Sequence, residues 1–143
     1  MEITMFEKLL LAADGSKHSF RAAEKALAIA KLNEKSEIHI VYVIDGSTSK
    51  ADVLSHYDAQ SISEQRKAKL RPIEDMLVKE EVKHQFDIIY GETGPSIVKY
   101  ANENEFDLVV IGSRGLNSLQ EMVLGSVSHK VAKRANCPVM IVK

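Results

Sequence analysis

Two kinds of apolar pattern alternate along this 143-residue chain. Five short runs are rich in leucine, valine and isoleucine, as buried strands are: 6–14, 36–45, 83–91, 107–113 and 138–143. Between them, apolar residues recur at the three- or four-residue spacing of helices. The segments with this spacing are 17–33 (Phe20, Ala23, Leu27, Ala30), a long helix with Ile62, Leu70, Ile73 and Leu77, 94–104, and 126–135.

Turn signals separate these segments. Asp14-Gly15-Ser16 allows a turn after the first run, with Ser16 able to cap the next helix. Residues 46–55 are small and polar and predict a loop, and Pro138 stands at the first position of the last strand, where a missing N–H is tolerated. The resulting strand–helix order predicts one α/β domain over residues 1–143. We expect a single open, mainly parallel five-stranded sheet with helices on both faces, Rossmann-like or flavodoxin-like.

Composition narrows the class of protein. The net charge of −1 and the pI near 6.5 argue against a nucleic-acid footprint, which needs clustered positive charge. No apolar run approaches the roughly 20 residues of a membrane span, and the first residues lack the order of a signal peptide. A single cysteine, Cys137, excludes an intrachain disulfide, and the five histidines lack metal-ligand spacing. We therefore expect a cytoplasmic protein.

Glycines are concentrated around the fourth strand. Gly112 and Gly115 are followed, after nine residues, by Gly125-Ser126 at the start of the last helix. Glycine lets backbone N–H groups approach an anion, and a helix N-terminus favours phosphate. Ser126, Ser128 and Arg114 add donors. The alternative is that Gly112 only ends a strand and Gly125-Ser126 only begins a helix, and spacing alone does not choose between these two interpretations.

Several other function classes lack their motifs. The sequence has neither a P-loop nor a G-x-G-x-x-G fingerprint after its first strand. It has no G-x-S-x-G elbow of a hydrolase. A phosphoryl-accepting receiver domain would want an acidic residue ending the third strand, where Tyr90-Gly91 stands. Ligands of open parallel sheets bind at the carboxyl ends of the strands, so Asp14, the end of the second strand and the glycine loop should meet at one edge.

Four segments together resemble the universal stress protein family, of the UspA-like superfamily. They are LLLAADGSKHS, HIVYVID, FDLVVIGSRG, and the G-2x-G-9x-G-S pattern that leads into VSHKVAKRANCPVMIVK. The resemblance covers Phe6 to Lys143, and the intact pattern is that of the ATP-binding branch. One small departure is AADG, where AVDG is commoner.

The resemblance implies a site for ATP, with Mg²⁺ held through the phosphates. Asp14 would lie near ribose, adenine or Mg²⁺, the Val43 backbone would bond adenine, and Ala12 and Ile111 would line that pocket. The residues implied at ribose and phosphates are Gly112, Ser113, Arg114, Gly115, Gly125, Ser126, Val127 and Ser128.

A binding or regulatory role is therefore expected, as a homodimer paired through the apolar last strand, 138–143, if that strand lies at the sheet edge. Two alternatives stay open. One is a weak ATPase or self-phosphorylating enzyme, for which Asp14 is the only nearby carboxylate. The other is an interaction scaffold without nucleotide. His129 is expected on the helix surface, and Cys137 is expected to be buried and inert.

Overall fold

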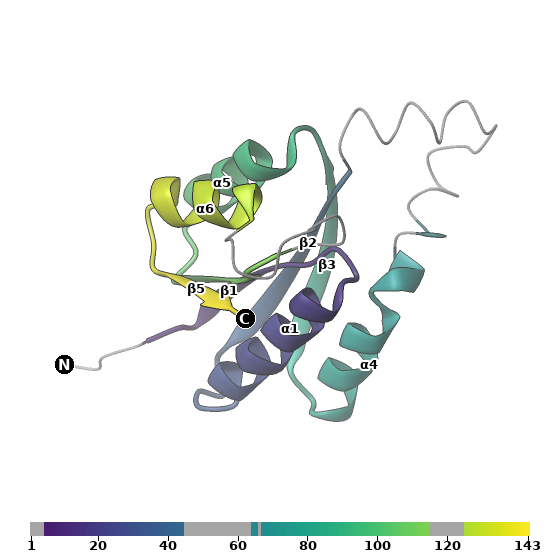
Figure 1. The fold of residues 1–143 in the computed structure, drawn as a ribbon. Coiled ribbons are helices and arrows are strands. Elements are labelled where there is room, and N and C mark those ends of the chain that lie inside the picture. Colours follow the sequence, from purple (N-terminus) through teal and green to yellow (C-terminus); the bar gives the residue numbers. More distant parts are fainter. Residues whose placement is uncertain (1–4, 45–63, 66, 115–124) are drawn as a thin grey trace.

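The structure is a computed structural model, and it describes residues 5–44, 64–65, 67–114 and 125–143. Strands and helices alternate along these ranges (Figure 1). The elements are β1 (Lys8–Ala12), α1 (Lys17–Ala30), β2 (Glu37–Ile44), α4 (Arg71–Lys79), β3 (Lys83–Tyr90), α5 (Thr93–Glu103), β4 (Leu108–Gly112), α6 (Ser126–Arg134) and β5 (Val139–Val142).

The strands form one parallel sheet in the order β3-β2-β1-β4-β5. This confirms the α/β fold with a parallel five-stranded sheet, and the order is the Rossmann type of the two expected architectures. The chain proceeds outward on one side from β1 through β3, then returns to the other side of β1 with β4. The topological switch point, where such sheets bind ligands, therefore lies between the carboxyl ends of β1 and β4.

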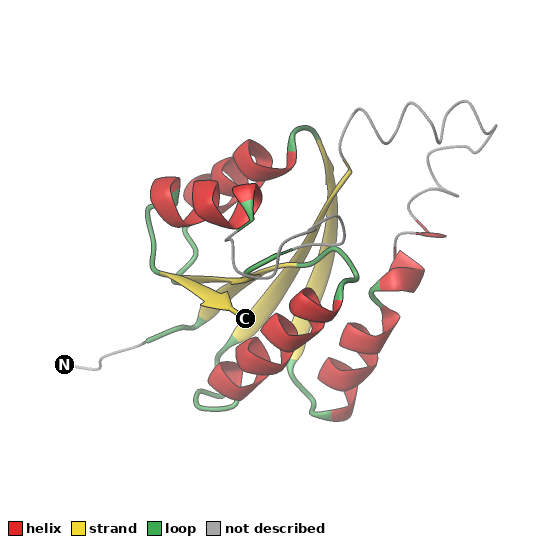
Figure 2. Ribbon diagram, in the orientation of Figure 1, coloured by secondary structure: helices red, strands yellow, loops and turns green. Residues whose placement is uncertain are grey.

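Helices cover both faces of the sheet (Figure 2). α1 and α4 pack on one face, where the core includes Leu9 and Leu11. α5 and α6 lie together on the other, where the core includes Leu10. Successive strand residues point to opposite faces, so a strand covered on both sides must be apolar at every position. The leucines of β1 meet this requirement and are fully buried.

The first helix begins as its cap predicts. Ser16 is the N-cap, and its Oγ accepts a 3.1 Å hydrogen bond from the Ser19 backbone N–H. The buried face of α1 consists of small residues, Ser19, Ala22, Ala23, Ala26 and Ala30. Phe20, which shares the apolar spacing of this helix, lies outside the buried face and is 37% exposed. Small alanines let the helix lie close to the sheet, and the bulkier ring is left outside.

Some element boundaries differ from the sequence prediction. The first strand begins at Lys8 rather than at residue 6, because Phe6 has a left-handed φ of 58° that interrupts extended backbone. Pro138 precedes the last strand rather than opening it. The predicted long charged helix is interrupted at Leu70, which is the N-cap of α4, but Leu70, Ile73 and Leu77 are all buried on one side. The predicted loop 46–55, and Ile62, lie outside the described residues.

Candidate functional site

The carboxyl ends of β1, β2 and β4 place predicted site residues at the same height in the sheet. Ala12 of β1 lies opposite Val41 of β2 and Ile111 of β4. Two residues further along each chain stand Asp14, Val43 and Ser113, which therefore align at the carboxyl edge of the three central strands. The convergence expected from the sequence is present, and it occurs at the switch point.

Side-chain alternation separates the two sides of this edge. Ala12, Val43 and Ile111 all belong to the face covered by α5 and α6, where Ala12 and Ile111 are buried in the core. The N-terminus of α6 lies on that same face. The three apolar side chains and the start of α6 therefore lie on the same side of the sheet.

The Asp14 loop is organised by its own hydrogen bonds. The Oδ1 atom of Asp14 accepts a 2.9 Å bond from the Ser16 backbone N–H. Gly15 has a left-handed φ of 85°, which glycine adopts without a steric penalty. Asp14 thus acts as a turn residue, as the simpler interpretation of Asp-Gly-Ser requires. Its half-buried position at the strand end also places its charge beside the site.

Backbone contacts join the two ends of the glycine loop. The Gly125 N–H donates to the Ser113 carbonyl at 2.9 Å, and the Ser113 N–H donates to the Val142 carbonyl at 2.7 Å. The Ser128 hydroxyl donates to the Gly112 carbonyl at 2.6 Å. This hydroxyl was expected to donate to phosphate. In the structure it donates to Gly112 instead, and this bond holds α6 against β4. Residues 115–124, including Gly115, lie outside the described residues.

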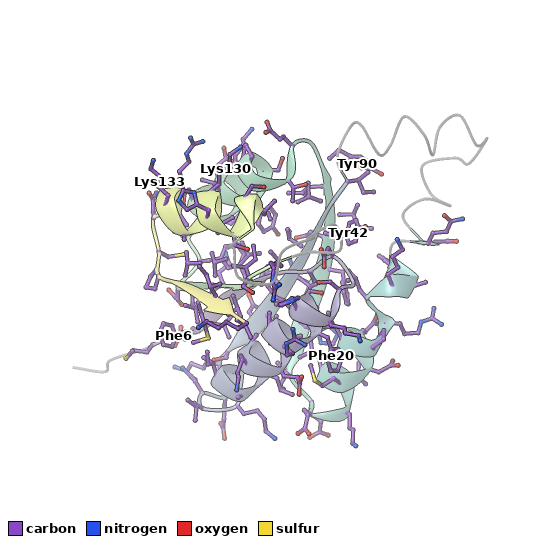
Figure 3. The ribbon with its side chains drawn as sticks, in the orientation of Figure 1. Phe6, Phe20, Tyr42, Tyr90, Lys130 and Lys133 are labelled. Carbon is purple, nitrogen blue, oxygen red and sulfur yellow. The ribbon has the colours of Figure 1, made fainter. Side chains whose placement is uncertain are left out.

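The first turn of α6 has the properties of an anion site. Gly125 is the N-cap and provides no side-chain hydrogen bond to the helix. The first N–H groups of a helix have no partner within it and carry the positive end of its dipole. Ser126 is exposed and Val127 half-buried at this end. Lys130 and Lys133 lie further along α6 (Figure 3), and the Nζ atom of Lys130 is 3.5 Å from Glu92 Oε1, beside the start of α5.

His18 is a neighbour of the site that the sequence analysis did not select. Its Nδ1 atom lies 3.4 Å from Ser113 Oγ and 3.2 Å from Arg21 Nη2. Burial lowers the pKa of His18 below its ordinary value of 6.5, and the Arg21 and Arg114 guanidinium groups lower it further, while Asp14 opposes them. His18 was recognisable only from tertiary structure, because it requires that β4 be known to lie beside β1 and α1.

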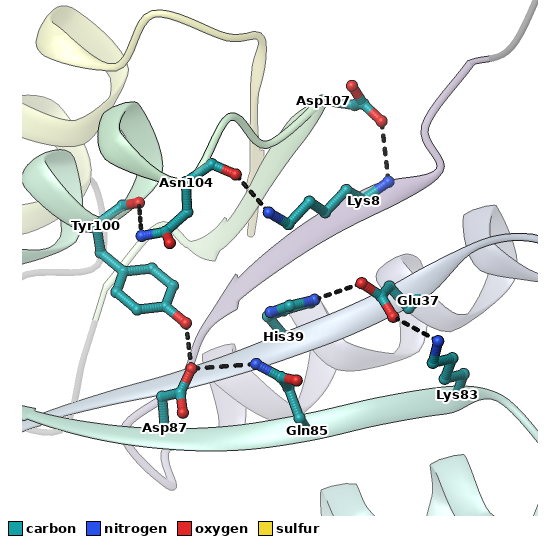
Figure 4. A network of polar contacts seen from close by, with 9 residues as sticks. All are labelled: Lys8, Glu37, His39, Lys83, Gln85, Asp87, Tyr100, Asn104 and Asp107. Carbon is teal, nitrogen blue, oxygen red and sulfur yellow. Dashed lines mark hydrogen bonds and ion pairs between the residues drawn. The ribbon is translucent and has the colours of Figure 1, made fainter.

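A second polar cluster joins β2, β3 and α5 (Figure 4). There the imidazole of His39 bonds Glu37 Oε1 at 2.8 Å, and Lys83 Nζ is 3.2 Å from Glu37 Oε2. The hydroxyl of Tyr100 donates to the carboxylate of Asp87. Glu37, His39 and Lys83 lie toward the amino ends of the strands, whereas Asp87 is level with Val41 on the outer strand β3. The paired groups link β2 to β3 and β3 to α5.

A hollow outside the predicted site lies between α1 and α4. It has a volume of about 340 Å³ and is lined by Phe20, Pro72 and Ile73, with Lys17 and Lys69 among its charged residues. It contains none of the predicted site residues.

The other residues singled out in the sequence are not part of the site. Cys137 is half-buried, and burial raises the pKa of its thiol. His129 is exposed, as predicted. The described residues contain no group of three or more metal-ligating side chains, and no described helix is long and apolar enough to cross a bilayer.

Known proteins are similar to this chain in sequence and in fold. The universal stress protein family matches residues 5–143. The universal stress protein YxiE of Bacillus subtilis is 37% identical over 149 aligned residues, which cover 97% of this chain and all of YxiE. The solved structure of the hypothetical protein MJ0577 is 29% identical, with a TM-score of 0.84 and coverage of 98% of this chain and 97% of that one.

A third likeness concerns the fold alone. The universal stress protein from Archaeoglobus fulgidus, solved in complex with dAMP, is 23% identical with a TM-score of 0.72. It aligns with 98% of this chain, over its own full length. The family match over residues 5–143 and the similarity to YxiE confirm the resemblance seen in four segments of the sequence: the chain belongs to the universal stress protein family.

Proposed function

We propose that this protein is a cytoplasmic stress-response regulator, one domain over residues 1–143, that binds ATP at the carboxyl edge of its sheet. The observation that carries the proposal is the alignment of Asp14, Val43 and Ser113 beside the N-terminus of α6. That arrangement offers an apolar surface for a base and a positive helix end for phosphates, joined by the turn at Asp14.

The base would lie against Ala12, Val43 and Ile111, with the Val43 backbone as its hydrogen-bonding partner. The phosphates would lie over Gly112, Ser113 and Gly115 and against the first turn of α6, near Arg114. Ser126, Val127 and Ser128 would contribute backbone N–H groups, and Gly125 would let the phosphates approach closely, since the Gly125 N–H and the Ser128 hydroxyl are committed to the Ser113 and Gly112 carbonyls. Mg²⁺ would neutralise phosphate charge, held through the phosphates themselves. The Archaeoglobus relative, of the same fold, holds an adenine nucleotide, dAMP.

A charge placed at the start of α6 tests this site. Ser126→Asp should stabilise the free helix, because an acidic residue at a helix N-terminus complements the dipole. The same charge should repel phosphates, so calorimetry should show MgATP binding at least tenfold weaker than to the wild type. Opposite signs for stability and affinity separate a ligand effect from damage to the fold.

Asn33→Asp is the matched control. Asn33 lies in the turn after α1, at the other end of the sheet, and its Oδ1 accepts a 2.9 Å bond from the Lys35 N–H, which aspartate can also accept. This variant adds the same charge and should bind MgATP as the wild type does. If the wild type fails to bind ATP, or if both variants bind as it does, the proposed site is wrong.

The proposal includes a homodimer paired through residues 138–143. β5 lies at the edge of the sheet, with β4 its only partner strand among the described residues. Pro138 and Val142 direct their carbonyls to β4, so the polar backbone groups of Val139 and Ile141 face outward. An apolar strand with outward-facing backbone groups is suited to pairing with a second copy.

A further inference from the structure

His18 occupies a position where helix and strand are in close contact. A Cβ on Gly112 would lie 2.8 Å from the Cβ of His18 and 2.9 Å from its carbonyl carbon. The first turn of α1 is thus pressed onto the end of β4, and the imidazole reaches Ser113, a residue of the proposed phosphate site. No contact of His18 is needed to explain the fold of α1, whose cap is Ser16.

The partner of the ring fixes its protonation. A guanidinium group carries only donors, so Nδ1 of His18 must accept from Arg21 Nη2 across their 3.2 Å contact. Nδ1 therefore carries no proton, and the ring is neutral with its proton on Nε2. The same arginine donates through Nε to the Lys143 carbonyl at 2.9 Å, which holds its guanidinium in place at the edge of β5.

Charged groups from three segments act on this ring. Arg21 comes from α1, Arg114 follows β4, and Asp14 belongs to the loop after β1. Burial and the two guanidinium groups lower the pKa of His18, and only the Asp14 carboxylate raises it. An additional anion beside Ser113 would act in the same sense as Asp14. It would favour the imidazolium form and attract it in turn.

We propose that His18 is the proton-linked residue of the nucleotide site. It is neutral when the site is empty, and it is protonated at Nδ1 from solvent when phosphates bind beside Ser113, with the ring turned so that Nδ1–H no longer faces the Arg21 donors. This inference rests on the proposed function. Because protonation is favoured in the complex, affinity should increase as the pH falls from 8 toward 6. A tenfold gain in affinity corresponds to each unit by which bound phosphate raises the pKa of His18.

Proton uptake measured by calorimetry tests the proposal. MgATP is titrated at pH 7 in Hepes, Mops and Tris, whose different ionisation enthalpies reveal the protons exchanged. His18→Asn retains an acceptor near the Nδ1 position but does not titrate. We expect the wild type to take up a substantial fraction of one proton more than this variant. The titration of ATP itself is common to both and cancels in the difference.

His84→Asn is the matched control. His84 lies on β3 and contacts the Val82 carbonyl through Nδ1 at 2.8 Å, a bond that the asparagine amide can replace. It should exchange protons as the wild type does. Equal proton uptake by the wild type and His18→Asn would overturn the role of His18 while leaving the nucleotide site intact. Absence of ATP binding to the wild type would overturn the proposed function, and this inference with it.

Nuclear magnetic resonance of the wild-type imidazole provides a test that needs no variant. In the free protein at pH 7, the ¹⁵N shifts of His18 should show an unprotonated Nδ1 and a protonated Nε2. With saturating MgATP at pH 6.5, both nitrogens should be predominantly protonated. A ring that stays neutral in the saturated complex would contradict the proposal even if His18→Asn does not fold.

Discussion

The hydroxyl of Ser128 donates a 2.6 Å hydrogen bond to the carbonyl of Gly112 and ties the first turn of α6 to the end of β4. Both residues are buried. The bond closes the two ends of the glycine loop on each other, in addition to the backbone bond from Gly125 to Ser113. The start of α6 is consequently fixed relative to the sheet.

Removing this hydroxyl should weaken the fold. Ser128→Ala leaves the buried Gly112 carbonyl without its donor, and we expect a loss of about 1–2 kcal/mol in the free energy of unfolding. Urea denaturation monitored by circular dichroism measures this loss. Ser126→Ala, at an exposed position of the same turn, should change stability by less than about 0.5 kcal/mol. Equal effects of the two substitutions would contradict this assignment.

Adding a methyl group at Gly112 should force α1 away from β4. The Cβ would meet the backbone and Cβ of His18, so Gly112→Ala should destabilise by about 1–3 kcal/mol through overpacking. Gly94→Ala is the control, because its Cβ would approach only the flexible Lys130 side chain, with Cδ at 3.0 Å. Thermal unfolding should separate the two variants clearly. A Gly112→Ala protein as stable as the wild type would contradict this prediction, because it would show that α1 can move away from β4 with no loss of stability.

Acid should selectively remove the contribution of Glu37. The hydrogen bond from His39 lowers the pKa of Glu37 below its ordinary value of 4.5, and Lys83 adds to this effect. A carboxylate with a lowered pKa stabilises the folded state above its unfolded pKa, and this stabilisation is lost as the pH falls through the folded value. Wild type should exceed Glu37→Gln by about 1 kcal/mol at pH 6, and this difference should shrink steadily as the pH falls below 4.5.

Urea denaturation across this pH range measures the difference, and Glu103→Gln, at an exposed position on α5, is the control. Its difference from the wild type should stay nearly constant with pH. A gap between wild type and Glu37→Gln that widens toward pH 3 would show that the sign is wrong.

A charge on the outer strand should separate the proposed dimer. Met140 of β5 is 38% exposed. In the proposed dimer a lysine at this position would place its charge against the paired strand of the second copy. Met140→Lys should shift sedimentation at micromolar concentration from dimer to monomer. Leu32→Lys, on a side chain 85% exposed at the far end of α1, should leave the wild-type state unchanged. A wild type that sediments as a monomer would refute the edge pairing.

Predictions from the sequence were correct where a single residue determines the local backbone structure. Ser16 could be predicted as a cap because its hydroxyl bonds a backbone N–H three residues away. The strand predicted at 36–45 is observed as β2, Glu37–Ile44, because its β-branched and apolar residues suit a strand buried on both faces. Phe20 shares the apolar spacing of α1 but is not on its buried face, because the helix carries apolar side chains on more than one side. The spacing of apolar residues alone does not say which side of the helix packs on the sheet.

The sequence by itself determined the alternation of strands and helices, the parallel sheet and the family pattern around Gly112 and Gly125. These depend on periodicity and on short motifs, which act within a few residues of each other. Only the tertiary structure decided that β4 lies beside β1, that Ala12 is in register with Val41 and Ile111, and that His18 reaches Ser113 from the opposite layer. Strand order and register arise from contacts between residues up to about a hundred positions apart, and no local pattern encodes such contacts.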